Sequence, residues 1–205
     1  MGVLDAMGLE WQQDATDLAP VRAYDTRQRQ TLKRMMQHEL NAPKTTSAGR
    51  LFDAVAALLG LCQVNDFEGQ AAMMLEAAAA VGTGDKALPT AGIVMLEGRM
   101  VIDWRPTVSG MVSQVRAGAS AADLGHAFHH ALADAISEVA CRMAIPRVVL
   151  TGGCFQNDLL ACLAVERLQQ RGLSVMQHRW VPPNDGGLAV GQLAFAARPR
   201  LRETD

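Results

Sequence analysis

The segment 147–178 constrains the fold of this 205-residue chain more strongly than any other part. It reads as a buried strand over 147–151, a glycine pair at 152–153, a helix over 157–170 and a second strand over 173–178. Strands joined through a helix pair in parallel, because the helix returns the chain to the edge of the sheet at which the first strand began. The sequence therefore predicts a parallel βαβ unit and an α/β fold.

Outside this unit, the spacing of apolar residues predicts mostly helices. Leu124, Phe128 and Leu132 recur at helical spacing, and the run 67–80, rich in Ala and Met, is typical of a buried helix. A glycine between two short apolar runs predicts a β-hairpin over 93–104. The expected helices lie at 24–40, from 47 onward, at 67–80, 108–117, 121–143 and 188–197.

The length of the chain suits one compact unit, since domains average about 150 residues. We expect an irregular lead-in over 1–21 that ends at Pro20, a folded unit over 22–197 and a tail over 198–205. The chain is 49% hydrophobic and 20% charged, which is ordinary for a globular protein and excludes a disordered or fibrous one.

Charge and hydropathy limit the partners. The net charge of −2 argues against broad, charge-driven binding of nucleic acid. No apolar stretch of about 18 residues is present to span a membrane, and the first residues lack a basic and apolar signal sequence, so we expect a cytoplasmic protein. The four cysteines show no CxxC spacing and predict buried free thiols: Cys62, Cys141, Cys154 and Cys162.

Glycines between a strand and a helix form the first candidate site. At Gly152 and Gly153, backbone N–H groups could approach an anionic ligand at the start of the following helix, although such glycines are also common for steric reasons alone. Asn157 could contact a ligand or cap the helix. Asp185, between two prolines and two glycines, could bind a cation or cap the final helix.

Further candidates lie upstream. Asp53 falls within an amphipathic helix, where it faces solvent or binds a group such as the hydroxyls of a ribose. Gly69 permits close approach of a ligand or only forms a turn. His126 and His130 lie four residues apart with His129 beside them, so two imidazoles share one helical face. No third metal ligand is evident nearby, and a solvated or interface-facing histidine cluster is the alternative.

Four motifs, taken in order, resemble the C-terminal part of the HypF carbamoyltransferases of NiFe-hydrogenase maturation. The resemblance extends from about Arg22 to Ala197, and Thr46 departs from it where serine is common. The motifs are TTSAGRLFDAVAALLG at 45–60, FEGQAA at 67–72, LTGGCFQN at 150–157 and PPNDGGLAVG at 182–191.

The resemblance implies an actin/Hsp70-like (ribonuclease H-like) lobe, related to TsaD and to antibiotic O-carbamoyltransferases, in which a nucleotide lies between two lobes. It implies that Asp53 and Gly69 contact the ribose end of that nucleotide. Gly152, Gly153 and Asn157 would contact the nucleotide, and Asp185 would bind a catalytic divalent metal such as Mg, Fe or Zn. Asn184 stands where related proteins can place the acidic ligand. The metal-binding histidines of the family lie upstream of all four motifs, so the resemblance assigns no metal to His126 and His130.

The function implied by the resemblance is the nucleotide-binding portion of an enzyme that uses ATP and carbamoyl phosphate. Such an enzyme forms a carbamoyl-adenylate and carbamoylates the C-terminal cysteine of a HypE-like acceptor protein. Catalysis would require the missing N-terminal lobe or a companion chain. The alternatives are a non-catalytic lobe that serves as a binding or assembly module, with a homodimer as one form, or part of an antibiotic-type O-carbamoyltransferase.

Overall fold

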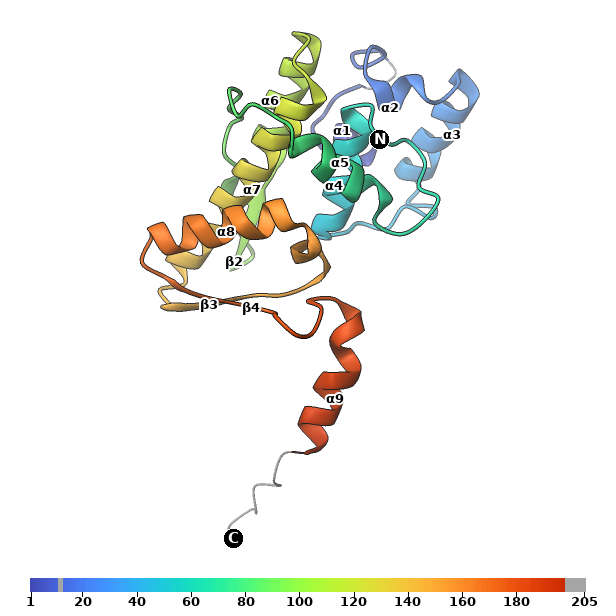
Figure 1. Ribbon diagram of the computed structural model, residues 1–205. Helices are drawn as coiled ribbons and strands as arrows, with labels where there is room; N and C mark the ends of the chain where they lie inside the picture. The colour runs from blue at the N-terminus through green and yellow to red at the C-terminus, as the bar shows by residue number, and fades with distance from the viewer. Residues whose placement is uncertain (11–12, 198–205) are drawn as a thin grey trace.

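A mixture of helices and two small sheets makes up the chain (Figure 1). The computed structural model describes residues 1–10 and 13–197, so the expected tail at 198–205 lies outside the described residues. The helices are α1 Gly2–Ala6, α2 Ala19–Arg22, α3 Thr26–Gln37, α4 Ala48–Leu58, α5 Gln70–Ala79, α6 Arg105–Arg116, α7 Ala121–Arg142, α8 Asp158–Gln170 and α9 Leu188–Ala196. The strands are β1 Gly92–Leu96, β2 Arg99–Asp103, β3 Arg147–Leu150 and β4 Ser174–Gln177.

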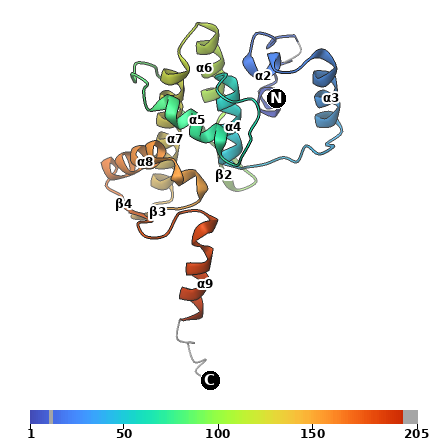
Figure 2. The same cartoon turned by 45° about the vertical axis from the view of Figure 1, so that its right-hand side comes forward.

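The long helix α7 organises the core. It packs against α5, α6 and α8, and α5 in turn packs against α4 (Figures 1 and 2). The aromatic centre of this core is the edge-to-face pair Phe52 and Phe128, whose ring centroids lie 5.2 Å apart. Leu75, Met111 and Leu124 are fully buried around it. The core therefore joins α4, α5, α6 and α7 into one body.

Local sequence explains where several helices begin. Asp25 and Gln28 form a reciprocal capping box at the start of α3, and the Ser47 hydroxyl accepts a hydrogen bond from Arg50 N at the start of α4. The Ser120 hydroxyl caps α7 by accepting from Asp123 N at 3.1 Å. The helix α6 begins three residues before its expected start at 108, because Pro106 fits the first turn of a helix.

The expected hairpin is confirmed. Strands β1 and β2 are antiparallel, with Gly92 opposite Asp103 and Leu96 opposite Arg99. The two turn residues, Glu97 and Gly98, both have positive φ angles, of 49° and 76°. Two such residues form the tight turn whose twist matches that of the flanking strands.

The parallel βαβ unit is also confirmed, since β3 and β4 are parallel and α8 connects them. A small second core of Leu150, Ala164 and Leu168 lies between the strands and α8. The other face of this sheet is uncovered: the paired residues Val149 and Met176 are 54% and 47% exposed. The prediction of a buried strand is therefore right for one face only.

The helix α9 extends away from the body of the molecule (Figures 1 and 2). None of its residues is buried, although its sequence is LAVGQLAFA. Leu193 and Phe195 are 71% and 76% exposed. An apolar helix of this kind needs a packing partner, and the described part of this chain does not supply one.

Three sequence expectations need correction. The lead-in 1–21 is not simply irregular, because it contains α1 and the start of α2, and Leu4 and Leu18 are buried in the main core. Pro20, which was expected to end this segment, instead lies in the first turn of α2. The helix in 67–80 is buried on one side only, since α7 covers one face and leaves Met73 60% exposed.

The cysteine prediction is also only partly right. All four thiols are free, but Cys162 is exposed and the other three are half-buried. No helix within residues 1–10 and 13–197 combines the length and the apolar character needed to cross a bilayer.

Replacing Phe128 by alanine tests the central position of the aromatic pair. We expect the free energy of unfolding to fall by about 3–5 kcal/mol, because the substitution leaves a cavity beside Phe52. Met73→Ala, on the exposed side of α5, is the matched control and should change it by less than about 1 kcal/mol. Urea denaturation measures both. Equal effects of the two substitutions would contradict this description of the core.

Candidate functional site

The turn that follows β3 is open to solvent. Gly152 has φ 100° and ψ 158°, a conformation that residues with a Cβ rarely adopt. The 3₁₀ turn η1, Gly153–Gln156, follows it, and Phe155 N donates to Gly152 O at 3.0 Å. A Cβ placed on Gly152 or Gly153 would meet no atom within 4 Å, so a ligand has room to approach the backbone here.

The loop 182–187 lies directly beside this turn, since Gly152 N donates to Pro183 O at 2.7 Å. The structure thus brings together the glycine pair and the loop that carries Asp185. Asn184 caps the short 3₁₀ turn η2, Asp185–Gly187, by accepting from Gly186 N at 3.1 Å. The Asp185 side chain is exposed and makes no hydrogen bond or ion pair with any described residue. The capping role considered for Asp185 is therefore wrong, and its carboxylate is available to a ligand.

An open groove of about 540 Å³ lies between the strand ends, this loop and α9. Ligand sites commonly have volumes of roughly 300–1,000 Å³ and lie at the carboxyl ends of parallel strands. Its lining residues are Thr151, His178, Val181, Pro182, Pro183, Asn184, Gly187, Leu188, Gly191, Gln192 and Phe195. His178 Nε2 lies 2.9 Å from the Thr151 hydroxyl oxygen, so the first residues after β3 and β4 meet at its wall.

Asn157 acts inside the protein rather than at the surface. It is 8% exposed, and its Oδ1 accepts from Leu160 N at 2.7 Å, which caps α8. Its Nδ2 lies 2.9 Å from His129 Nε2. The capping role considered for Asn157 is therefore confirmed.

Asp53 lies on α4, which packs against η1. Its side chain is 21% exposed, and Oδ2 lies 3.0 Å from Arg50 Nη1. That contact lacks hydrogen-bond geometry, and Oδ2 has no hydrogen-bond partner in the described part of the chain. Gly69 precedes α5 with φ 83°, so a turn with a left-handed residue explains this glycine. The described contacts do not bring Gly69 to the glycine pair.

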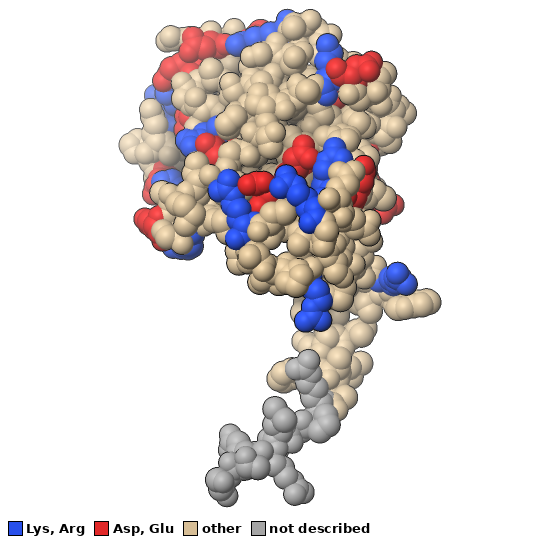
Figure 3. Space-filling view, turned by 90° about the vertical axis from the view of Figure 1, so that its left-hand side faces the viewer, with Lys and Arg blue, Asp and Glu red and all other residues tan. Residues whose placement is uncertain are grey.

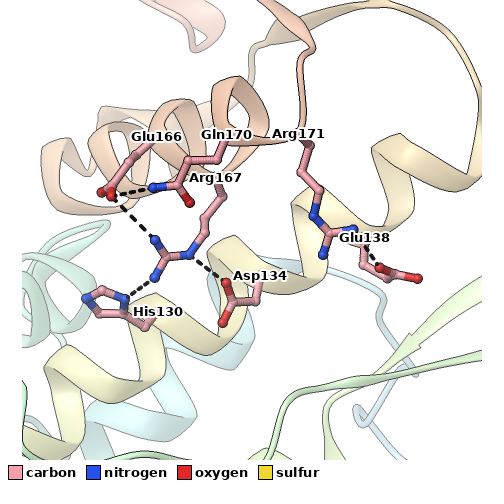
Figure 4. A network of polar contacts seen from close by, with 7 residues as sticks. All are labelled: His130, Asp134, Glu138, Glu166, Arg167, Gln170 and Arg171. Carbon is pink, nitrogen blue, oxygen red and sulfur yellow. Dashed lines mark hydrogen bonds and ion pairs between the residues drawn. The ribbon is translucent and has the colours of Figure 1, made fainter.

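The rings of His126 and His130 lie in contact at a tilt of 43°, with centroids 4.5 Å apart, but polar neighbours engage one of them. His130 Nδ1 accepts from Arg167 Nη2 at 3.0 Å, and Arg167 Nε donates to Asp134 Oδ1 at 2.7 Å (Figure 4). A cation beside the Arg167 guanidinium would be repelled. Within the described residues, no three His, Cys, Asp or Glu side chains gather as a metal-binding group.

The network continues along α7 and α8. Glu138 forms an ion pair with Arg171 at 3.3 Å (Figure 4). It forms a second one with Arg142, one turn along α7, at 2.9 Å. Acidic and basic side chains lie next to one another across the face shown in Figure 3. The pairs Arg167–Asp134 and Arg171–Glu138 join α7 to α8 and its C-terminal end, and His130 belongs to this structural network.

Comparison with known proteins matches almost the entire chain to one family. The family model described as the carbamoyltransferase Kae1-like domain, second subdomain, matches residues 1–192. The carbamoyltransferase HypF of Rhodobacter capsulatus is 39% identical over 199 residues, covering 95% of this chain and 24% of the relative. The chain belongs to the HypF carbamoyltransferase family.

Other members of the HypF family are similar to this chain in sequence and in structure. HypF of Synechocystis is 36% identical over 78% of this chain and 20% of the relative. The structure of full-length HypF in its phosphate- and nucleotide-bound form superposes with a TM-score of 0.79 and 31% identity, over 86% of this chain and 24% of that one. This chain therefore spans about a quarter or less of these relatives, in the C-terminal carbamoyltransferase domain.

Sequence reasoning missed two residues of the site. His178 and the buried His129 carry no local motif in the HypF pattern quoted above. His178 could have been found as the first residue after the second strand of a parallel unit, where ligand-binding residues concentrate. For His129, the available signal was its position on the helix. It follows Phe128 and lies three residues before Leu132, so it borders the apolar face.

Burial changes the acid–base properties of this region. The pKa of His129 is lowered, first because burial disfavours the charged imidazolium and then through repulsion by His126 and His130. The pKa of His130 is lowered by burial, His126 and Arg167, in that order. Burial likewise raises the pKa of the Cys154 thiol. Both histidines are therefore stable as neutral side chains in the folded protein.

The lowered histidine pKa values predict acid sensitivity. The unfolded chain takes up protons near pH 6.5, at about the ordinary histidine pKa, before the folded chain does. The contribution of the neutral histidines to the free energy of unfolding should be fully present above pH 6.5, at about the ordinary histidine pKa. It should be lost as the pH falls from there toward the pKa of the folded state. Urea denaturation at pH 7.5, 6.5 and 5.5 measures this loss. It should be smaller in His129→Gln and unchanged in His38→Gln, and an equal loss in all three proteins would contradict the assignment.

Proposed function

We propose that this chain is the nucleotide-binding portion of a HypF-type carbamoyltransferase, and that it forms an actin/Hsp70-like lobe. The observation that carries the proposal is the contact between Gly152 N and Pro183 O, which places an open glycine turn beside an exposed carboxylate at the ends of two parallel strands. Phosphate recognition uses such backbone amides together with the N-terminus of a following helix.

The glycine pair and Asp53 then have roles consistent with their positions, and Gly69 keeps the role that the resemblance implies. The backbone at Gly152 and Gly153 would approach the nucleotide, while Asp53, on the helix packed against η1, would lie toward its ribose end with Gly69. Asn157 has its side-chain oxygen committed to Leu160 N, so its contribution would be to hold the turn.

A divalent metal fits one part of this arrangement. Asp185 offers one exposed carboxylate, and Mg²⁺ is commonly held by one or two carboxylates together with substrate phosphates. A closed zinc site of four protein ligands does not fit, because the described residues supply no such group. When bound, the cation would neutralise phosphate charge and polarise the oxygen at the reacting centre.

In the proposed reaction sequence, water cleaves carbamoyl phosphate to carbamate and phosphate. The carbamate oxygen then attacks the α-phosphorus of ATP, which forms a carbamoyl-adenylate and releases pyrophosphate. The carbamoyl group of this adenylate then passes to the C-terminal cysteine thiolate of a HypE-like acceptor, and AMP leaves. The residues of this chain would bind and orient the nucleotide during both steps. We further propose that the enzyme works in the cytoplasm.

The uncovered apolar surface supports a requirement for a second polypeptide unit. The matched family model is a second subdomain, and the exposed side chains of Val149, Met176, Leu193 and Phe195 lie on faces that nothing in the described chain covers. We propose that an upstream subdomain, in the same polypeptide or in a companion chain, packs on this surface. The same surface favours a second candidate function, a non-catalytic assembly module that forms a homodimer.

Asp185→Ala should lower carbamoylation of the acceptor by about a hundredfold or more once the chain is combined with the upstream part, because the metal loses its ligand from this lobe. Circular dichroism should be unchanged, since this side chain supports no described contact. Glu97→Ala, an exposed acid in the hairpin turn, is the control. Normal turnover of the Asp185 variant would exclude this residue as a metal ligand.

Phe195→Asp tests whether the upstream part packs on the uncovered apolar surface of α9. A charge on α9 should weaken association with the upstream part by at least about tenfold, because an apolar contact is replaced by a carboxylate that must lose its hydration. Gln192→Asp, on the same helix, should weaken it less. Analytical ultracentrifugation of the chain alone and of the mixture measures both. A homodimer that dissociates in Phe195→Asp would instead support the assembly module.

A further inference from the structure

His129 is the one histidine of the 126–130 cluster that is completely buried, at 0% exposure. It lies on α7, and its ring contacts the turn of the proposed nucleotide site through Asn157. We propose that His129 is a positioning residue that holds the glycine turn in its open shape by fixing the side chain of Asn157. The expected effect on nucleotide binding rests on the proposed function. The hydrogen bond between His129 and Asn157, called the link below, does not.

The hydrogen bonds determine how each group is oriented. Gly125 O can only accept, so His129 Nδ1, at 2.7 Å, carries the proton and donates it. His129 Nε2 is then an acceptor, and the group that donates to it at 2.9 Å is Asn157 Nδ2. This leaves Asn157 Oδ1 to accept from Leu160 N at 2.7 Å. A chain of hydrogen bonds thus runs from α7 through one imidazole and one amide into α8.

The turn is held at both ends. At its start, Gly152 N donates to Pro183 O, and at its end Asn157 N donates to Cys154 O at 3.3 Å. Between these points Cys154 and Phe155 pack against the core, while no atom would meet a Cβ on Gly152 or Gly153. The position of Asn157 therefore sets where the open turn ends, and His129 sets the position of its amide.

The same imidazole also contacts the helix that carries Asp53. The His129 ring packs edge-on against Phe52, with centroids 5.5 Å apart, and Phe52 directly precedes Asp53. One buried side chain therefore joins the GRLFD helix, the GGCFQN turn and α7. We expect a disturbance at His129 to affect both of the motifs assigned to the nucleotide.

The link requires a neutral imidazole. Protonation would place a hydrogen on His129 Nε2, where it would clash with the NH₂ group of Asn157. If the Asn157 amide rotated to avoid this clash, its NH₂ group would face Leu160 N and the helix cap would be lost. Ionisable side chains on the elements packed around His129 include His126, His130 and Asp134 of α7, Arg50 and Asp53 of α4, Glu76 of α5, Cys154 of η1, and Asp158 and Arg167 of α8. Charge on His126 and His130 opposes protonation of His129, and no ion pair to it occurs within residues 1–10 and 13–197.

Two substitutions separate a positioning role from simple core filling. In His129→Gln, the side-chain carbonyl oxygen can reach the place of Nε2 and accept from Asn157. In His129→Asn, the shorter amide can only replace Nδ1, so the acceptor is lost. Both variants remove the ring from beside Phe52 and should lower stability to a similar extent. A difference between them in the turn therefore reports on the hydrogen bond to Asn157.

Hydrogen exchange of the 205-residue chain measures the turn without any ligand. We expect His129→Asn to speed exchange of Leu160 N–H by about tenfold relative to His129→Gln, because the cap is released. In the wild type, ¹⁵N chemical shifts of His129 should report a proton on Nδ1 at pH 7.5. A proton on Nε2 of the wild type would overturn the proposal, and this test remains if His129→Asn does not fold. Equal exchange rates of Leu160 N–H in the two variants would also overturn it.

Nucleotide binding supplies the functional readout. Isothermal titration of the chain with Mg-ATP, in the presence of the upstream part if that is needed, should give about tenfold weaker binding for His129→Asn than for His129→Gln. Wild-type affinity should fall as His129 becomes protonated, and that pH dependence should be absent in His129→Gln. If the wild type binds no ATP, the proposed function fails while the exchange result still tests the link. If ATP affinity follows stability alone in both variants, the positioning role is wrong.

Discussion

The parallel pairing of β3 with β4 is the constraint on which the candidate site depends. Parallel strands cannot be joined by a tight turn, so α8 must carry the chain from the end of β3 back to the start of β4. Both strands then end at the same edge, and the chain leaves each of them there. The contact between Gly152 and Pro183 follows from this geometry, and with it the approach of the glycine turn to the loop of Asp185.

The site and the core share residues, which couples stability to the shape of the site. Burying an imidazole is unfavourable unless its nitrogens find partners, and His129 finds them in Gly125 O and Asn157 Nδ2. Asn157 in turn supplies the cap that begins α8, the helix whose apolar side covers the sheet. A single buried polar connection thus supports the βαβ unit, the central helix and the open turn at once.

The surfaces left uncovered are as informative as the core. Parallel sheets are normally covered on both faces, yet one face of β3 and β4 exposes Val149 and Met176, and the apolar helix α9 buries nothing. The chain spans about a quarter or less of the HypF proteins of Synechocystis and Rhodobacter capsulatus and of the full-length HypF structure. Phe195 of the uncovered helix α9 also lines the groove at the strand ends.

Local sequence specifies the helices from α3 onward, the hairpin and the βαβ unit, because caps, turn glycines and apolar periodicity act within a few residues. It also marks the motifs at 45–60, 150–157 and 182–191 that carry the resemblance to HypF. Burial is different, since it depends on which elements meet. Only the tertiary structure shows that Leu18 belongs to the core, that one face of the sheet is exposed, and that His129 lies inside, hydrogen-bonded to Asn157. Those contacts join residues far apart in the chain, and no short pattern in the sequence encodes them.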